Sequence, residues 1–149
     1  MTNKWVSFFI SNERYCANIS SIKEILPYQQ ANPFPGADQN TEGILSIRGE
    51  VLTILNGDKI FSCENITPKN NIIVIEDESE HRLGISIDDI DQIIEVEPEQ
   101  IERPTDKTND FIIGTVNTEE HLYILVDFKS LIDVQQGLSG DPDSLVSTN

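Results

Sequence analysis

Tyr15-Cys-Ala-Asn-Ile-Ser-Ser-Ile-Lys-Glu-Ile-Leu26 has a counterpart in the same chain, Leu83-Gly-Ile-Ser-Ile-Asp-Asp-Ile-Asp-Gln-Ile-Ile94. The two stretches align without a gap. Their large apolar positions coincide, with Ile19, Ile22, Ile25 and Leu26 on Ile87, Ile90, Ile93 and Ile94. Self-similarity of this kind is typical of an internal duplication, in which each copy is one structural unit.

The similarity continues on both sides of these stretches. An apolar run and a polar turn come before each of them, and further along Gly43–Phe61 aligns with Gly114–Ile132. The copies therefore span about 4–61 and 72–132, and we interpret the chain as a duplicated unit.

Each copy has the pattern of a small β unit. Short β-branched and aromatic runs bounded by turn residues predict strands. After the second strand, apolar residues three apart predict a short helix capped by Asn18 or Ser20, with Glu24 on its otherwise apolar surface. Asn56 and Asp127 are expected to cap a final helical turn in each copy. The sequence therefore predicts a mostly β protein with one small barrel per copy, the two packed together.

Two connections and a tail lie outside these elements. Residues 27–42 and 97–110 are rich in proline and turn residues and are expected to be long connecting loops. Residues 1–135 would form the domain, and the polar, turn-rich residues 136–149 a flexible tail.

The composition narrows the class of function. The 149 residues include 26 Asp and Glu against 10 Lys and Arg, a net charge of −16. Such a surface repels phosphate backbones and anionic lipids, which argues against nucleic acid and membrane partners. The acidity is interpreted as a device for solubility, as adaptation to a salty cytoplasm, or as complementarity to a basic partner. The short apolar run near the start is no membrane span or signal core, so we expect a cytoplasmic protein.

The sequence contains no pattern typical of a reaction centre. No G-x-S-x-G, Walker or G-x-G-x-x-G motif occurs. Cys16 lies in an apolar strand, and with Cys63 the pattern favours two reduced thiols over a disulfide. His81 and His121 fall in expected hairpin turns without neighbours at metal-ligand spacing. We expect no catalytic residue, no metal and no cofactor.

Several separated motifs together resemble a known family. Trp5–Ile25 is similar to the opening of CheW-like chemotaxis coupling proteins, including Ile22-x-Glu24-Ile25. Gly43-Ile-Leu-Ser-Ile-Arg48-Gly49 resembles the Gly-x-x-Asn-x-Arg-Gly signature of that family, with Ser46 in place of Asn. The second copy resembles the second half of the family, so that the similarity covers about residues 4–134.

The resemblance implies a fold and a role. It implies two five-stranded SH3-like β-barrels and a non-catalytic scaffold that links chemoreceptor cytoplasmic tips to the regulatory domain of a histidine kinase. The location implied is the receptor array on the inner face of the membrane. In such proteins the groove between the barrels receives the receptor tip, and barrel ends contact the kinase.

The resemblance also points to individual residues. The positions that match functional positions of the family are Ile22, Glu24, Gly43, Arg48 and Gly49. The equivalent turn of the second copy lacks the arginine, since it consists of Asn117-Thr-Glu-Glu120. Because Glu24 and Arg48 occur together only in the first copy, we predict an ion pair between them at the mouth of the groove between the barrels.

One segment departs from the family. Thr53-Ile-Leu-Asn-Gly-Asp58 replaces the usual proline followed by Asp-Leu-Arg, which places Asp58 where an arginine often contributes to the partner surface. This leaves two alternatives to the principal scaffold: an accessory or inhibitory protein that competes for the kinase domain, or an adaptor of a non-flagellar pathway. A ligand-binding or hydrolytic small barrel is a third hypothesis from another class.

Overall fold

The computed structural model of the chain describes residues 3–33, 35–105 and 111–136. Within these ranges the chain folds into ten strands, two short α-helices (α) and two 3₁₀ turns (η). Their order is β1 (Lys4–Ile10), β2 (Glu13–Asn18), η1 (Ile19–Ser21), β3 (Ile22–Pro27), β4 (Thr41–Ile47), β5 (Glu50–Asn56), α1 (Gly57–Ile60), β6 (Asn71–Glu76), β7 (Arg82–Ile87), β8 (Asp89–Glu95), η2 (Pro98–Gln100), β9 (Ile112–Asn117), β10 (Leu122–Val126) and α2 (Phe128–Gln136).

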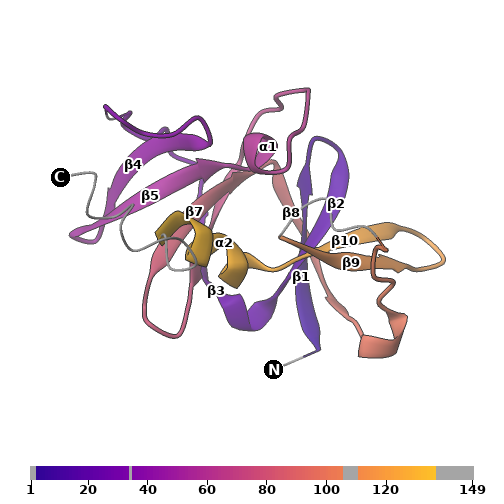
Figure 1. Cartoon of the computed structure of the whole chain (residues 1–149). Helices are drawn as coiled ribbons and strands as arrows, with labels where there is room; N and C mark the ends of the chain where they lie inside the picture. Colours follow the sequence, from indigo (N-terminus) through magenta and orange to yellow (C-terminus); the bar gives the residue numbers. More distant parts are fainter. Residues whose placement is uncertain (1–2, 34, 106–110, 137–149) are drawn as a thin grey trace.

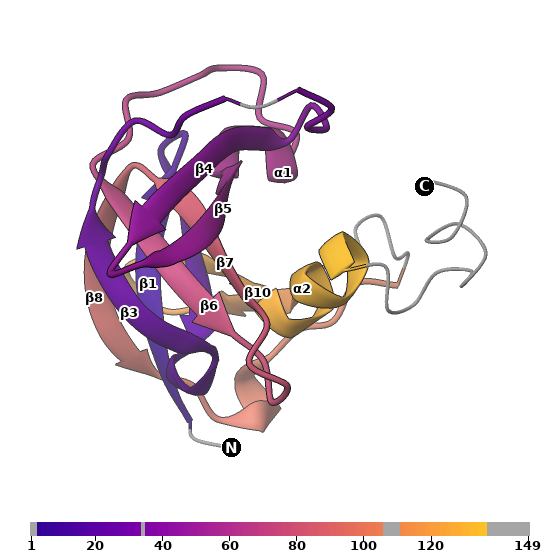
Figure 2. The same ribbon diagram turned by 90° about the vertical axis from the view of Figure 1, so that its left-hand side faces the viewer.

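The strands form two five-stranded sheets, which confirms the predicted fold class. Sheet A has the order β8-β1-β2-β10-β9, and sheet B has the order β3-β6-β7-β5-β4. Figure 1 shows the two sheets side by side, with the β4–β5 and β9–β10 hairpins pointing away from each other. Figure 2 shows how sheet B curls into an open, SH3-like barrel.

Each sheet combines strands from both copies, which corrects the expectation of one barrel per copy. The first two strands of the first copy, β1 and β2, pair with β8, β9 and β10 of the second copy. In the same way, β6 and β7 join β3, β4 and β5. Alternating patterns do not distinguish the two arrangements, because a strand has the same inward and outward faces whichever copy its partner comes from.

The strand register agrees with the duplication inferred from the sequence. The parallel ladder of sheet A pairs Leu125 with Cys16, and that of sheet B pairs Ile54 with Gly84. The sequence alignment places Cys16 on Gly84 and Ile54 on Leu125, so the two ladders have the same register.

A β-bulge, not a helix, explains the apolar residues three apart. η1 is a single 3₁₀ turn capped by the Asn18 side chain, and β3 begins directly after it at Ile22. The ladder to β6 shifts between Ile22 and Glu24, which leaves Lys23 as the extra residue. The extra residue of a bulge shifts the alternation of side chains by one position. Ile22 and Ile25 therefore lie on the same face of the strand although they are three residues apart. The predicted short helical turn and its Asn18 cap are therefore confirmed for Ile19–Ser21, but the turn does not continue to Glu24, which lies on a strand.

Three apolar cores hold the sheets together. A small core inside sheet A contains Trp5, Tyr123 and Leu125, and its counterpart inside sheet B contains Ile72, Leu52 and Ile54. The largest core lies between the sheets, and both sheets contribute to it with Phe8, Ile10, Tyr15, Ala17, Ile73, Ile75, Leu83, Ile85 and Ile87. Strands that are buried on both faces read as nearly continuous apolar runs, as Ile72–Ile75 does.

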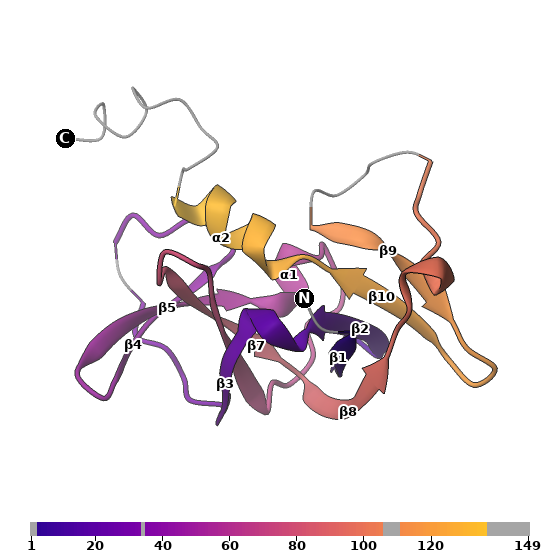
Figure 3. The ribbon, with the colours of Figure 1, turned by 90° about the horizontal axis from the view of Figure 1, so that it is seen from below.

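The two helices follow the predicted capping residues. The Asn56 side chain accepts a hydrogen bond from the Lys59 amide in α1, and Asp127 accepts one from the Lys129 amide in α2. α2 lies between the two hairpins (Figure 3). Its apolar face enters the shared core through Phe128, Leu131 and Ile132, which are at most 1% exposed.

Both long connections run along the outer strand that follows them. Asn32 exchanges backbone hydrogen bonds with Ile44 of β4, and Glu102 does so with Thr115 of β9. The connections thereby cover edges that would otherwise expose unpaired backbone groups. Of the predicted tail, residues 136–149, Gln136 is the last residue of α2, and residues 137–149 lie outside the described residues.

Candidate partner-binding surface

The β4–β5 hairpin presents the predicted Arg48-Gly49 pair at its tip. Ile47 pairs with Glu50, so these two residues form a two-residue turn. Both have positive φ, 50° at Arg48 and 81° at Gly49, as a type I′ turn requires. Glycine adopts this conformation without strain, whereas arginine does so less readily. The turn holds the arginine side chain away from the sheet, 66% exposed.

Glu24 reaches this turn from the opposite edge of the same sheet. The Arg48 guanidinium donates a hydrogen bond to the Glu24 carboxylate, which confirms the predicted ion pair. β3 and β4 are the two outer strands of sheet B, so the pair bridges the open side of this barrel. The bulge at Lys23 contributes to this geometry, because it directs Glu24 to the same face as its ladder partner Val74.

The ion pair lines a pocket of about 370 Å³. Sheet B and its β4–β5 turn supply the whole lining: Lys23, Glu24, Ile47, Arg48, Glu50, Val51, Leu52, Val74 and Arg82. The sequence predicts this pair at the mouth of a groove between the barrels. The structure corrects that location, because the pocket that contains the pair belongs to one barrel. Val51 at its rim is 71% exposed, so charged groups surround an accessible apolar side chain.

A chain of ion pairs continues across the pocket. Arg82 contacts Glu76 at 2.6 Å and also pairs with Glu50, and Lys23 lies 3.7 Å from Glu76. The hydrogen bond from Arg82 is the main reason that the pKa of Glu76 is lowered, and the same bond raises the pKa of Arg82. The positive charges of three cations thus balance three carboxylates at this site, although the net charge of the whole chain is −16. The cations are Lys23, Arg48 and Arg82, and the carboxylates are Glu24, Glu50 and Glu76.

The other two predicted positions lie apart from the tip of the hairpin. Ile22 begins β3 and packs against the shared core. Gly43 is buried in β4, where an added Cβ would overlap the backbone carbonyl of Asn32. Gly114 has the same relation to the Glu102 carbonyl, so the duplication itself points to a packing role for both glycines. A partner-binding role for Ile22 and Gly43 stays a prediction.

The counterpart surface on sheet A has different chemistry. Gln92 occupies the position of Glu24, and its side-chain amide donates to the hydroxyl of Tyr123 at 3.0 Å. Glu119 occupies the position of Arg48 in the β9–β10 turn. The arrangement of opposite charges at the tip of the hairpin is therefore specific to sheet B, as the sequence predicts.

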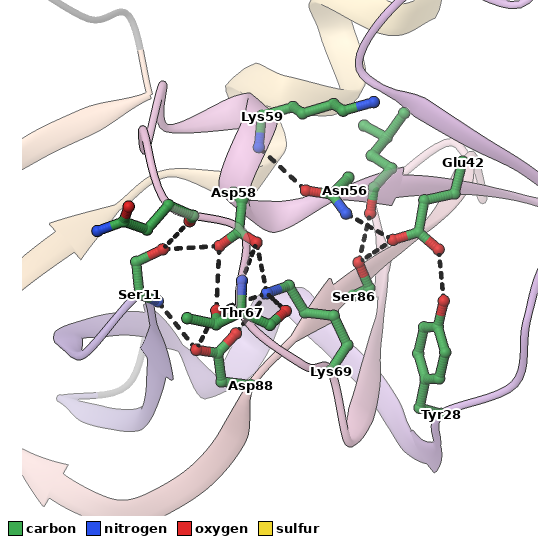
Figure 4. A network of polar contacts seen from close by, with 12 residues as sticks. Ser11, Tyr28, Glu42, Asn56, Asp58, Lys59, Thr67, Lys69, Ser86 and Asp88 are labelled. Atoms are coloured by element: carbon green, nitrogen blue, oxygen red, sulfur yellow. Dashed lines mark hydrogen bonds and ion pairs between the residues drawn. The ribbon is translucent and has the colours of Figure 1, made fainter.

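Asp58 does not lie on the partner surface, which corrects the sequence interpretation. Its side chain is fully buried and binds Lys69, whose ammonium lies 2.6 Å from both Asp58 and Asp88 (Figure 4). Ser11 and Thr67 donate further hydrogen bonds to the two carboxylates. The cluster joins the β1–β2 turn, α1 and the segment that leads into β6.

A second polar cluster lies beside it. Glu42 accepts hydrogen bonds from the Tyr28 hydroxyl at 2.9 Å, the Asn56 amide at 2.8 Å and the Ser86 hydroxyl at 2.5 Å (Figure 4). Burial and the bond to Glu42 raise the pKa of Tyr28 to about 12. Sequence reasoning missed both clusters, although Glu42 and Lys69 stand next to apolar strands where an unpaired charge would be costly.

The thiols fit the predicted structural role. Cys16 and Cys63 are both free, with Cys16 fully buried. Burial raises the pKa of the Cys16 thiol to about 12, so the thiol stays protonated near neutral pH and is a poor nucleophile.

The fold and its surface define a class of protein: a duplicated, two-barrel β protein whose exposed ion pairs surround an apolar rim. Such a surface is suited to binding other proteins. Within the part of the chain that the structure describes, no helix is long and apolar enough to span a membrane.

Comparisons with known proteins identify the family. The model of the CheW-like domain matches residues 4–136. The chemotaxis protein CheW of Treponema pallidum is 29% identical over 140 residues, which cover 88% of this chain and 82% of that protein. CheW of Bacillus subtilis is 24% identical over 149 residues, covering 94% and 93%. The crystal structure of the scaffolding protein TtCheW from Thermoanaerobacter tengcongensis has a TM-score of 0.75 at 23% identity, covering 85% of this chain and 90% of that chain.

The chain therefore belongs to the CheW-like family. It is a non-catalytic scaffold of chemotaxis signalling, as the resemblance implied.

Proposed function

We propose that this protein couples chemoreceptor cytoplasmic tips to the regulatory domain of a histidine kinase. The observation that carries the proposal is the Glu24–Arg48 pair, which holds an arginine exposed beside an apolar rim on sheet B. Arginine is enriched at protein interfaces, and the buried core of an interface is more apolar than the rest of the surface. The proposed location is the cytoplasm, at receptor arrays on the inner face of the membrane.

The proposed mechanism is simultaneous binding without chemistry. Each barrel offers an independent outer surface, so one protein can contact two partners at once. A change of receptor state alters which kinase conformation the assembly favours, because a partner shifts an equilibrium only through different affinities for the two states. Glu24, Arg48 and Gly49 contribute to one of these contacts, with Ile22 and Gly43 supporting the strands that carry them.

A three-component binding assay tests the proposal. The purified chain is mixed with a chemoreceptor cytoplasmic fragment and a kinase regulatory domain from the same genome, and complexes are separated by size-exclusion chromatography with light scattering. A ternary complex supports coupling. Binding to the kinase domain alone indicates a competitive inhibitor, and binding to neither contradicts the proposal.

The surface variant Arg48→Glu links the assay to the site. Lys59→Glu is a matched control, because Lys59 is exposed on α1, which follows the end of β5 opposite to the Arg48-Gly49 turn. We expect Arg48→Glu to weaken binding of at least one of the two partners and Lys59→Glu to leave both affinities unchanged.

A further inference from the structure

A second pocket lies in sheet A, away from the Glu24–Arg48 surface. Its volume is about 350 Å³, and it opens beside Asn3, directly before β1. Trp5, Val96 and Ile113 supply apolar walls. The cations Arg103 and Lys129 also line it.

The duplication shows what covers the corresponding place in sheet B. Tyr28 donates its backbone amide to the Asn70 carbonyl, and Val96 does the same to Asn3, so Asn3 is the counterpart of Asn70. In sheet B the residues just before Asn70 run over the barrel, and the side chain of Lys69 is only 5% exposed. This extended segment, residues 64–70, therefore occupies the counterpart of the sheet A pocket.

The polar groups that hold the segment in sheet B are replaced in sheet A. The alignment of the copies places Lys129 at the position of Asp58, and Ser20 at the position of Asp88. In sheet B, the carboxylates of Asp58 and Asp88 thus surround the Lys69 ammonium. At the same place, sheet A has the Lys129 ammonium instead of a carboxylate. Ile113 also replaces Glu42, which makes the pocket more apolar.

We propose that this pocket binds an extended segment of a partner protein that carries an acidic side chain among apolar ones. The segment follows the path that residues 64–70 take over sheet B, and its carboxylate meets Lys129 where Lys69 meets Asp58. The Lys129 ammonium lies 3.4 Å from Glu78, but that carboxylate is 91% exposed and can be displaced by a partner. This inference concerns a different barrel and does not depend on the proposed receptor and kinase contacts.

The protein contains a built-in reporter for the test. Trp5 is its one tryptophan and lines the pocket, so its fluorescence responds to a ligand there. The probe is a blocked peptide with the sequence of residues 62–71 that carries Cys63→Ser and Lys69→Glu. The matched peptide carries Cys63→Ser alone and keeps the lysine.

Titration of the full chain with each peptide distinguishes the outcomes. We expect a saturable change in Trp5 emission with the glutamate peptide, and affinity about tenfold lower for the lysine peptide. Lys129→Glu should reverse this preference, since Lys129 is 42% exposed and its replacement preserves the fold, as circular dichroism can verify. Lys23→Glu, in the pocket of sheet B, should leave it unchanged. Equal affinity for both peptides, no change in emission with either, or an unchanged preference in Lys129→Glu would overturn the proposal.

Discussion

Glu24 and Arg48 connect the two outer strands of sheet B by an ion pair across the open side of its barrel. The arginine is 66% and the glutamate 27% exposed, so water screens the pair and its contribution to folding is at most about 1 kcal/mol. Its main effect is to fix the direction of the Arg48 side chain. A fixed, exposed arginine loses less entropy when a partner binds.

Exchanging the charges of Glu24 and Arg48 tests whether the two residues act on partner binding independently or as a pair. Glu24→Arg and Arg48→Glu should each weaken partner binding about tenfold, while the double variant recovers part of the loss because the ion pair is restored in reverse. Isothermal titration with the kinase domain and the receptor fragment gives the four affinities. Independent, additive losses would show that the pair does not act as a unit.

Removal of the buried cation should cost far more stability than removal of an exposed one. Lys69→Met leaves the carboxylates of Asp58 and Asp88 close together without a counterion, and we expect a loss of about 3 kcal/mol. Urea unfolding measures it, with Lys59→Met as the control on the exposed side of α1. A loss below about 1 kcal/mol would contradict the assigned role of the cluster.

Gly43→Ala should destabilise the fold by about 2 kcal/mol or more, because the new Cβ overlaps the Asn32 carbonyl and forces the connection away from β4. Gly36→Ala is the control. Gly36 also has positive φ, but it has open space around its Cα, so only backbone strain of about 1 kcal/mol is expected there. Thermal unfolding of the two variants compares the effects, and equal losses would show that backbone conformation alone requires Gly43.

The ion pair between Arg82 and Glu76 should make stability depend on pH. The pKa of Glu76 is lower in the folded protein than the ordinary value of 4.5, so its contribution is present above that value and is lost as pH falls through the folded pKa. Arg82→Gln should therefore destabilise the protein at pH 7 and have a smaller effect near pH 3. Urea unfolding at both values measures this, and an effect independent of pH would assign the loss to packing.

The two cysteines should differ in reactivity. A thiol reagent such as dithionitrobenzoate is expected to modify half-buried Cys63 in the native protein, and buried Cys16 only after denaturation. The absorbance of the released thiolate counts the groups modified. Rapid reaction of both thiols in the native state would show that the core of sheet A opens readily.

Local features of the fold were predictable from the sequence because local chemistry determines them. The capping roles of Asn56 and Asp127, the Arg48-Gly49 turn and the duplication all follow from residue types at fixed spacing. The Glu24–Arg48 pair was predictable because its two members occur together in one copy only.

Features that depend on pairing between distant segments were not predictable. Strands exchanged between the copies have the same alternation of apolar and polar residues as strands in two separate barrels, so the sequence pattern does not distinguish the two arrangements. The bulge at Lys23 produces a spacing of three that a helical turn also produces. The sequence predicts Asp58 on the partner surface, because nothing in it reveals that Lys69 reaches Asp58 from a connecting segment.

The mixed origin of the two sheets determines the order in which the protein can form during synthesis. Sheet B needs no residue beyond Ile87, so it can assemble while the ribosome is still making the rest of the chain. β1 and β2 emerge first, yet β1 lacks β8 until Glu95 has left the exit tunnel, and β2 lacks β10 until Val126 has done so. The first strands to be made are thus the last to be completed, and during that interval their apolar faces are the part of the nascent chain most in need of chaperone protection.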